Sequence, residues 1–213
     1  MKSALFLSAS VLSLALLSNA GIAAPADQPG HQSPAPGTTN DTVSAVKDTV
    51  GHGIGVISAE MTTTTKGFAE AAAVSDMYEI EAGKIAQQRS LNPSVKEFAA
   101  KMMTAHTATT EKLKSALAAS HPEIVPPAHV DDRRQGMLDE LRGAKGADFD
   151  GRYMAQQIDA HKEALILMQG YAKNGDTASI KKLASKTAPV VQTHLNMAEK
   201  IQSTLNKQSS LSK

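Results

Sequence analysis

The sequence predicts an all-α protein, a four-helix up-down bundle with a short extra helix between the second and third long helices. Three observations carry this prediction. Apolar residues recur every three or four positions through four long segments, as on the buried face of an amphipathic helix. Aromatic residues make up only 3% of the 213 residues, whereas β-sheet proteins are rich in aromatic and β-branched side chains. Proline, glycine and asparagine stand between the four segments, where helices end.

Composition and charge exclude several classes of function. The 22 Lys and Arg residues against 21 Asp and Glu give a formal net charge of +1, which is not the basic balance of a nucleic-acid-binding protein. The sequence contains no Cys, so disulfides, thiol catalysis, Cys-ligated zinc and iron–sulfur clusters are excluded. It also lacks the Gly-x-Ser-x-Gly motif of a serine nucleophile. Histidine and carboxylate chemistry is what remains.

The first 66 residues are predicted to lie outside the folded domain. Residues 1–23 have the pattern of a signal peptide, with Lys2 before an apolar run and small residues before a cleavage site at Ala20 or Ala23. The run is shorter than the ~20 apolar residues that span a bilayer. We therefore expect export to a bacterial periplasm, with no membrane span after cleavage. Residues 24–66 are expected to form a Pro-, Gly- and Thr-rich linker, with a weak helix over 41–60.

The bundle domain is expected over residues 67–206, beginning with a helical hairpin. The first long helix is predicted over residues 68–89, which are rich in Ala, Glu and Lys. Asn92 and Pro93 are typical of the N-cap and first position of a helix, and the second long helix then continues to about Ser120. Three prolines close it, and the short extra helix follows over residues 131–142.

The other two long helices are expected to form a second hairpin. Asp148 can cap a helix over residues 149–173, and Asp176 can cap the last helix over residues 177–206. Pro189 lies inside that last helix, where it removes a backbone donor and is expected to bend the helix. Residues 207–213 are polar and are expected to form a frayed tail.

Three histidines lie on the apolar stripes of three different long helices, namely His106, His161 and His194. The first long helix contributes Glu79 on a face of small residues. Counted from the two hairpin turns at 1.5 Å per residue, the levels of these side chains differ by only about 5–8 Å. The four side chains can therefore meet inside the bundle. Periodicity alone does not choose between Glu79 and Glu81, since both have apolar neighbours at helical spacing.

Such a cluster has two interpretations. Three imidazoles and a carboxylate suit one zinc or non-haem iron ion, and bundle cores are where such sites are built. The same groups can instead form a metal-free polar network, in which Glu79 and a histidine satisfy each other. A di-iron centre is disfavoured, because it needs Glu three residues before His on two helices. Here these positions hold Met103, Ile158 and Val191.

Methionines near two of the histidines offer a third, less favoured interpretation. Met102 and Met103 precede His106, and Met197 follows His194 at helical spacing. A thioether with an imidazole can hold Cu(I). Methionine at such positions is more often a residue that fills gaps in an apolar core.

Over about residues 67–202 the sequence resembles DUF4142, an exported bacterial ferritin-like family without an assigned activity. The resemblance rests on residues 79–86 (EIEAGKIA), on Phe98 to His106, on Gly146 to Tyr153, on His161, and on Pro189 to His194. It implies a ferritin-like bundle, a leader and an envelope setting, and it selects Glu79 rather than Glu81. Family members often have Asp before the histidine of the second helix, where this chain has Ala105.

These observations predict an exported, periplasmic helical-bundle protein, envelope- or stress-associated, whose polar core can hold one metal ion. A non-enzymatic role is favoured. The alternatives are a metal-dependent ferritin-like oxidoreductase with Glu79, His106, His161 and His194 as ligands, and a purely structural interaction module. A partner protein in the envelope and a homo-oligomer are both compatible with the sequence.

Overall fold

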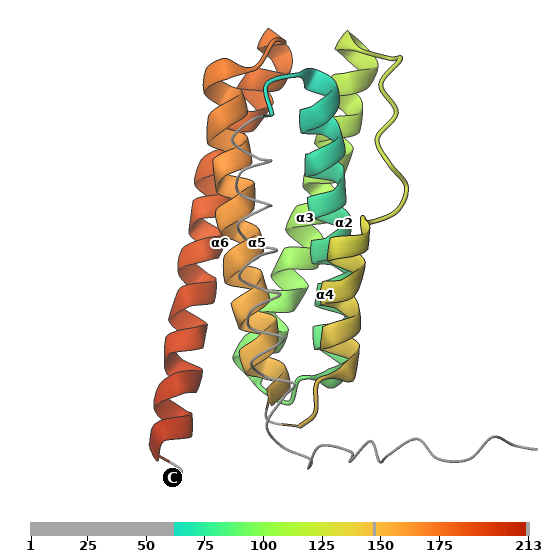
Figure 1. The fold of residues 1–213 in the computed structure, drawn as a ribbon. Helices are drawn as coiled ribbons and strands as arrows, with labels where there is room; N and C mark the ends of the chain where they lie inside the picture. The colour runs from blue at the N-terminus through green and yellow to red at the C-terminus, as the bar shows by residue number, and fades with distance from the viewer. Residues whose placement is uncertain (1–61, 147, 212–213) are drawn as a thin grey trace, which may run out of the picture. The chain divides into compact units, whose positions relative to one another are not determined.

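The computed structural model describes residues 62–146 and 148–211, which belong to one compact unit. These residues form five helices and no strand, so the predicted all-α fold is confirmed (Figure 1). The helices are α2 (Thr65–Arg89), α3 (Pro93–Ser120), α4 (Asp132–Gly143), α5 (Asp148–Asn174) and α6 (Ala178–Leu211). The expected signal peptide and the expected weak helix over 41–60 lie outside the described residues.

Helix ends follow local capping signals, with two departures from expectation. The side chain of Asn92 accepts the N–H groups of Ser94 and Val95, which starts α3 at Pro93 as predicted. Helix α2 begins earlier than expected, because the side chain of Thr64 caps it. Helix α6 continues to Leu211, where a frayed tail was expected from residue 207. No glycine or proline follows Pro189 to end this helix, and polar side chains are compatible with an exposed last turn.

The four long helices form two hairpins that pack against each other. Helices α2 and α3 make one hairpin, α5 and α6 the other, and the hairpins meet through α3 with α6 and α2 with α5. The short helix α4 packs on α2 and α5 and so covers that seam, as Figure 1 shows. Among the described helices, none covers the opposite seam, between α3 and α6. The bundle therefore has one covered and one open side.

Arginines fix α4 to the bundle. Glu163, on α5, is buried and accepts hydrogen bonds at 2.7–2.9 Å from both Arg133 and Arg134. The guanidinium of Arg134 also lies 4.9 Å from the ring centroid of Tyr78. Arg89 donates to three backbone carbonyls at the end of α4. Such planar, multiply hydrogen-bonded guanidinium groups are suited to a buried ion pair.

The core consists of two apolar clusters with a polar layer between them. One cluster contains Phe98, Leu141 and Tyr153, and the other contains Phe68 and Tyr171. Along each long helix the members of the two clusters occupy opposite halves of the sequence. The intervening turns carry the buried polar residues Asp76, Glu79, His106, His161 and His194. The sequence thus interrupts all four apolar stripes at one level.

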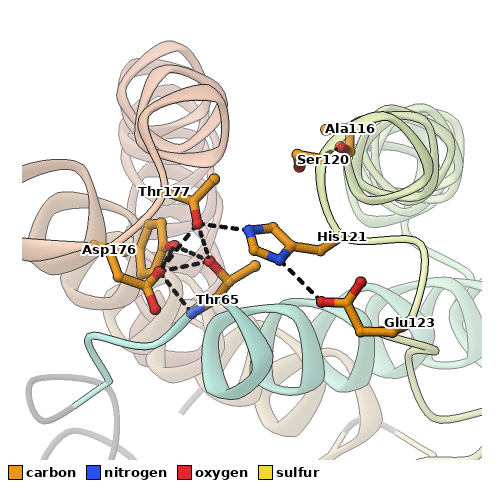
Figure 2. A network of polar contacts seen from close by, with 8 residues as sticks. Thr65, Ala116, Ser120, His121, Glu123, Asp176 and Thr177 are labelled. Carbon is orange, nitrogen blue, oxygen red and sulfur yellow. Dashed lines mark hydrogen bonds and ion pairs between the residues drawn. The ribbon is translucent and has the colours of Figure 1, made fainter.

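A second group of polar side chains, here called the turn network, joins the start of α2 to the α5–α6 turn (Figure 2). It comprises Thr65, Tyr171, Asp176, Thr177 and His121. The carboxylate of Asp176 accepts the backbone N–H of Thr65 at 3.0 Å and the Tyr171 hydroxyl at 2.8 Å. His121 lies 2.8 Å from the hydroxyl of Thr177. Asp176, expected to cap α6, instead binds α2, and α6 begins at Ala178.

The described helices include none that is both long and apolar enough to cross a membrane.

Candidate metal centre

Three histidines from three helices converge in the middle of the bundle. Each of His106, His161 and His194 offers one ring nitrogen, and these three atoms lie within 4.8 Å of one another. The ring centroids are 5.6–6.0 Å apart. All three side chains are buried, with residue exposures of 1–5%. The spacing of the three apolar stripes thus brings three imidazoles to one point.

Hydrogen bonds fix which nitrogen of two rings carries the proton. Nδ1 of His106 lies 2.7 Å from a carboxylate oxygen of Asp76, and Nδ1 of His161 lies 2.7 Å from the backbone carbonyl of Gln157. Because a carbonyl oxygen and an ionised carboxylate only accept, Nδ1 is the donor in both rings. In each neutral ring Nε2 is then left with a free lone pair, the form that binds a metal.

The three inward nitrogens have no hydrogen-bond partner within the described part of the chain. Nε2 of His106, Nε2 of His161 and Nδ1 of His194 are all buried and unpaired. A buried polar atom without a partner costs free energy, and native structures keep few of them. Three neighbouring imidazoles, each with a buried and unpaired nitrogen, form a donor set that suits a transition-metal ion.

Two carboxylates of α2 lie beside the imidazoles. Asp76 is 7% exposed and also accepts the hydroxyls of Thr109 and Thr110 at 2.9 and 3.1 Å. Glu79 is 1% exposed, and one of its oxygens lies 3.8 Å from Nδ1 of His161. Neither oxygen of Glu79 has a hydrogen-bond partner among the described residues. Glu79 therefore faces the protonated side of His161 rather than its free lone pair.

The surroundings shift the pKa values of the three histidines in different directions. Burial lowers the pKa of His106, but the hydrogen bond to Asp76 and the charges of Glu79 and Asp76 outweigh it, so the net shift is upward. Burial lowers the pKa of His161 despite the nearby Glu79. Burial, with repulsion from His161, His106 and Lys101, lowers the pKa of His194 to about 3. His161 and His194 are therefore neutral at pH 7.

The family model for the domain of unknown function DUF4142 matches residues 56–201. The chain belongs to this family. A comparison with curated proteins gave no match.

Several solved structures have the same fold as this DUF4142 chain. One is a DUF305 fragment from Deinococcus radiodurans, with a TM-score of 0.58 and 10% sequence identity. The match covers 65% of this chain and 95% of that chain. CopM in its Cu(II)-bound form has a TM-score of 0.59 and 18% identity, covering 68% and 99%. The Cu(I)-bound form of CopM gives 0.57 and 17%, covering 67% and 98%. Identities this low establish a common fold and nothing about the ligands.

Sequence reasoning on this DUF4142 chain missed Asp76. The residue stands three positions before Glu79, on the same face of α2, so helical spacing contained the signal. The carboxylate that contacts His106 comes from α2 and not from the preceding residue, which is Ala105. Glu81, the other acidic candidate, lies outside the cluster and pairs with Lys84 at 2.6 Å.

The other described histidines, and the methionines considered as copper ligands, have other contacts. His121 belongs to the turn network, and His129 is exposed in the α3–α4 connection. Met102 is part of an apolar cluster. Met103 packs on Gly83, and the sulfur of Met197 lies 3.5 Å from the Lys101 ammonium. These contacts are those of packing residues. His31 and His52 lie outside the described residues.

Proposed function

We propose that this DUF4142 protein is an exported, periplasmic helical bundle that binds one transition-metal ion through His106, His161 and His194. The observation that carries the proposal is the convergence of three buried histidines, each with one ring nitrogen within 4.8 Å of those of the other two and each with one buried ring nitrogen that has no partner among the described residues. A polar network without metal would have paired these atoms with each other or with neighbouring groups. A metal ion accepts all three lone pairs at once.

The neighbouring charges favour a divalent ion. Two acidic side chains, Asp76 and Glu79, are buried beside the imidazoles. Buried charges need compensation, and a divalent cation among three neutral imidazoles would provide it. Asp76 and the Gln157 carbonyl would hold two of the rings in the ligating orientation, as outer hydrogen-bond partners of metal-bound histidines do.

The donor set favours zinc(II) or copper(II) over non-haem iron. Iron oxygenase sites use two histidines and a carboxylate, whereas Glu79 here faces the back of His161. CopM, described in Cu(II)- and Cu(I)-bound forms, shares the fold, and this likeness supports testing copper beside zinc. The metal binds with deprotonated ligands, and two of the three histidines are already in that form at pH 7.

The test is metal stoichiometry and affinity in matched histidine variants. The mature chain, stripped of metal, is titrated with Zn(II) and with Cu(II) in a calorimeter, and elemental analysis follows gel filtration. We expect one ion per chain in the wild type. His161→Ala should bind at least 100-fold more weakly, because it removes one of three ligands.

The control is His129→Ala, which removes an exposed histidine outside the cluster. It should bind metal like the wild type. Circular dichroism shows whether His161→Ala remains folded; His161→Gln, closer in volume and neutral, serves if it does not. Less than about a tenth of an ion per wild-type chain, or equal affinity in the wild type and both His161 variants, contradicts the proposal.

Export is tested separately. The full chain is expressed in a bacterium, the periplasm is released, and the intact mass is measured. A mature chain beginning at Gly21 or Ala24 supports the signal peptide of residues 1–23. A chain that keeps Met1 and stays in the cytoplasm contradicts export without affecting the metal proposal.

A further inference from the structure

A large cavity opens on the uncovered seam between α3 and α6. Its volume is about 760 Å³, within the range of about 300–1,000 Å³ that small-molecule sites occupy. Side chains of all four long helices line it, whereas α4 lies against α2 and α5 on the covered seam. The cavity therefore enters the bundle from the side that α4 leaves open.

The inner end of this cavity reaches the histidine cluster. His106 and His194 both line it, and so does Asp76. The two histidines are only 5% and 4% exposed, and Nε2 of His106 and Nδ1 of His194 have no partner among the described residues. His161 does not line the cavity. A metal ion held by the three rings would thus have two of its ligands on the cavity side and one on the inner side.

The walls between the histidines and the mouth are apolar. Phe68, Leu113 and Leu167 belong to one of the two core clusters and also line the cavity. The mouth carries charges of both signs, Glu111, Lys112 and Lys186. Because the rim does not favour one sign, selection would take place inside, through apolar surface and the metal. An apolar body that enters the cavity is removed from water there, which favours its binding.

We propose that this cavity binds a small amphipathic molecule with an apolar body and one neutral nitrogen donor. The donor completes the coordination of the metal between His106 and His194, and the body lies against Phe68, Leu113 and Leu167. A neutral donor is expected because two acidic side chains, Asp76 and Glu79, are already buried beside the imidazoles, and an anionic donor would bury a further acidic group there. This inference rests on the metal site proposed above.

The test compares two probes that share a donor and differ in apolar body. The full mature chain is loaded with Co(II), whose visible absorption reports its coordination, and is titrated with imidazole and with 4-phenylimidazole. We expect 4-phenylimidazole to bind at least tenfold more tightly, because its phenyl ring is removed from water. Azide, a small anionic donor, should bind more weakly than 4-phenylimidazole.

Matched variants locate the binding. Ala164 lines the cavity on α5, and Ala164→Leu should reduce 4-phenylimidazole affinity at least tenfold while leaving Co(II) affinity within threefold. Ala72→Leu, at a lining residue of α2, is the second filling variant if the first does not fold. Ala119→Leu, exposed on α3 and outside the cavity, should change neither affinity.

The outcomes separate the two proposals. A chain that takes up no metal overturns both the metal site and this inference. A chain that takes up one ion but binds imidazole and 4-phenylimidazole equally, or keeps its affinity in both filled variants, overturns only the cavity proposal.

Discussion

At the end of the bundle one carboxylate oxygen of Asp176 accepts hydrogen bonds from Thr65 and Tyr171, while halfway along the bundle Nε2 of His106 and of His161 meet no partner in the described chain. Both groups of side chains join several helices. In the turn network Thr65 and Tyr171 are buried, whereas Asp176 is exposed. The turn network is complete in the protein alone. The cluster formed by His106, His161 and His194, with Asp76 and Glu79 beside it, is complete only with an added ligand.

From this difference we expect the turn network to serve stability and the histidine cluster to serve ligand binding. A saturated network fixes where helices meet, since each buried donor that loses its acceptor costs about 1–3 kcal/mol. A network whose buried polar atoms lack partners makes the folded chain less stable than an apolar layer in its place would. Binding of a ligand offsets this loss of stability. Variants of the two regions should therefore move different observables, and the expected effects can be ranked.

The largest expected effect is stabilisation by metal. A ligand that binds only the folded state at a free concentration of 1,000 times its Kd stabilises it by about 4.1 kcal/mol. At about 2–4 °C per kcal/mol, the melting temperature should rise by roughly 8–16 °C with Zn(II) or Cu(II). The rise is measured by calorimetry or circular dichroism and reversed with a chelator.

Variants of the two regions show whether the metal acts at the histidine cluster. His161→Ala should abolish the metal-induced rise, because it removes a ligand. Asp176→Ala should lower the starting melting temperature and yet show a rise of wild-type size. A rise that persists in His161→Ala, or disappears in Asp176→Ala, would show that metal acts elsewhere than at the histidine cluster.

The second effect concerns a residue that would not touch the metal. Asp76 accepts from Nδ1 of His106 at 2.7 Å, and Asp76→Asn removes its negative charge at nearly constant shape. Loss of an outer partner of a ligating histidine typically lowers metal affinity 10–100-fold, equivalent to about 1.4–2.7 kcal/mol. The check is the Kd for Zn(II) from chelator competition.

The control for Asp76→Asn is Asp139→Asn, an exposed acid on α4 paired with Arg142 at 2.7 Å. Its metal affinity should equal that of the wild type. If Asp76→Asn also binds metal like the wild type, the carboxylate serves only the packing of Thr109 and Thr110.

The sequence contains enough information for the helices and for the convergence of the histidines. Asn92 and Pro93 mark a helix start that the structure keeps, and three- and four-residue spacing placed His106, His161 and His194 on inward faces. Such periodicities depend on the backbone alone, so they can be counted along the chain. The approximate level of each residue follows from the 1.5 Å rise per residue.

The side of each imidazole that a neighbour contacts could not be predicted in this way. Whether Glu79 meets Nε2 or Nδ1 of His161 depends on the side-chain torsion angles and the rotation of α2, and neither is encoded in spacing. The turn network was missed for another reason. Thr65 and Asp176 are 111 residues apart, and each by itself carries an ordinary local signal, a spacer threonine and a helix cap. Their pairing arises only when the two hairpins pack.

The third effect is loss of stability when the turn network is broken. Asp176→Ala deprives the Thr65 N–H and the Tyr171 hydroxyl of their acceptor. The expected loss is about 1–2 kcal/mol, or a melting temperature lower by roughly 2–8 °C. Urea unfolding of the metal-free chain measures it. Asp139→Ala, which removes only exposed contacts with Arg142 and Gln135, should stay within about 0.5 kcal/mol of the wild type. Equal losses in the two variants would mean that the turn network adds no stability.

The fourth effect distinguishes the two regions by pH in the metal-free chain. Burial, with repulsion from His161, His106 and Lys101, lowers the pKa of His194 from 6.5 to about 3. The unfolded chain therefore binds this proton at higher pH than the folded one, so stability present above pH 6.5 is lost as the pH falls toward 3. The lowered pKa of His161 acts in the same sense as that of His194. The raised pKa of His106 affects stability only above pH 6.5, where its contribution is lost as the pH rises.

The turn network should respond only at lower pH. The hydrogen bond from Thr65 lowers the pKa of Asp176 from 3.8 to about 2, so its contribution, present above pH 3.8, is lost as the pH falls toward 2. Urea unfolding between pH 7 and pH 4 should therefore show a smaller loss of stability in His194→Gln than in the wild type. Asp176→Asn should keep the wild-type slope over this range. Parallel slopes for His194→Gln and the wild type would mean that protonation of the histidine cluster does not control stability there.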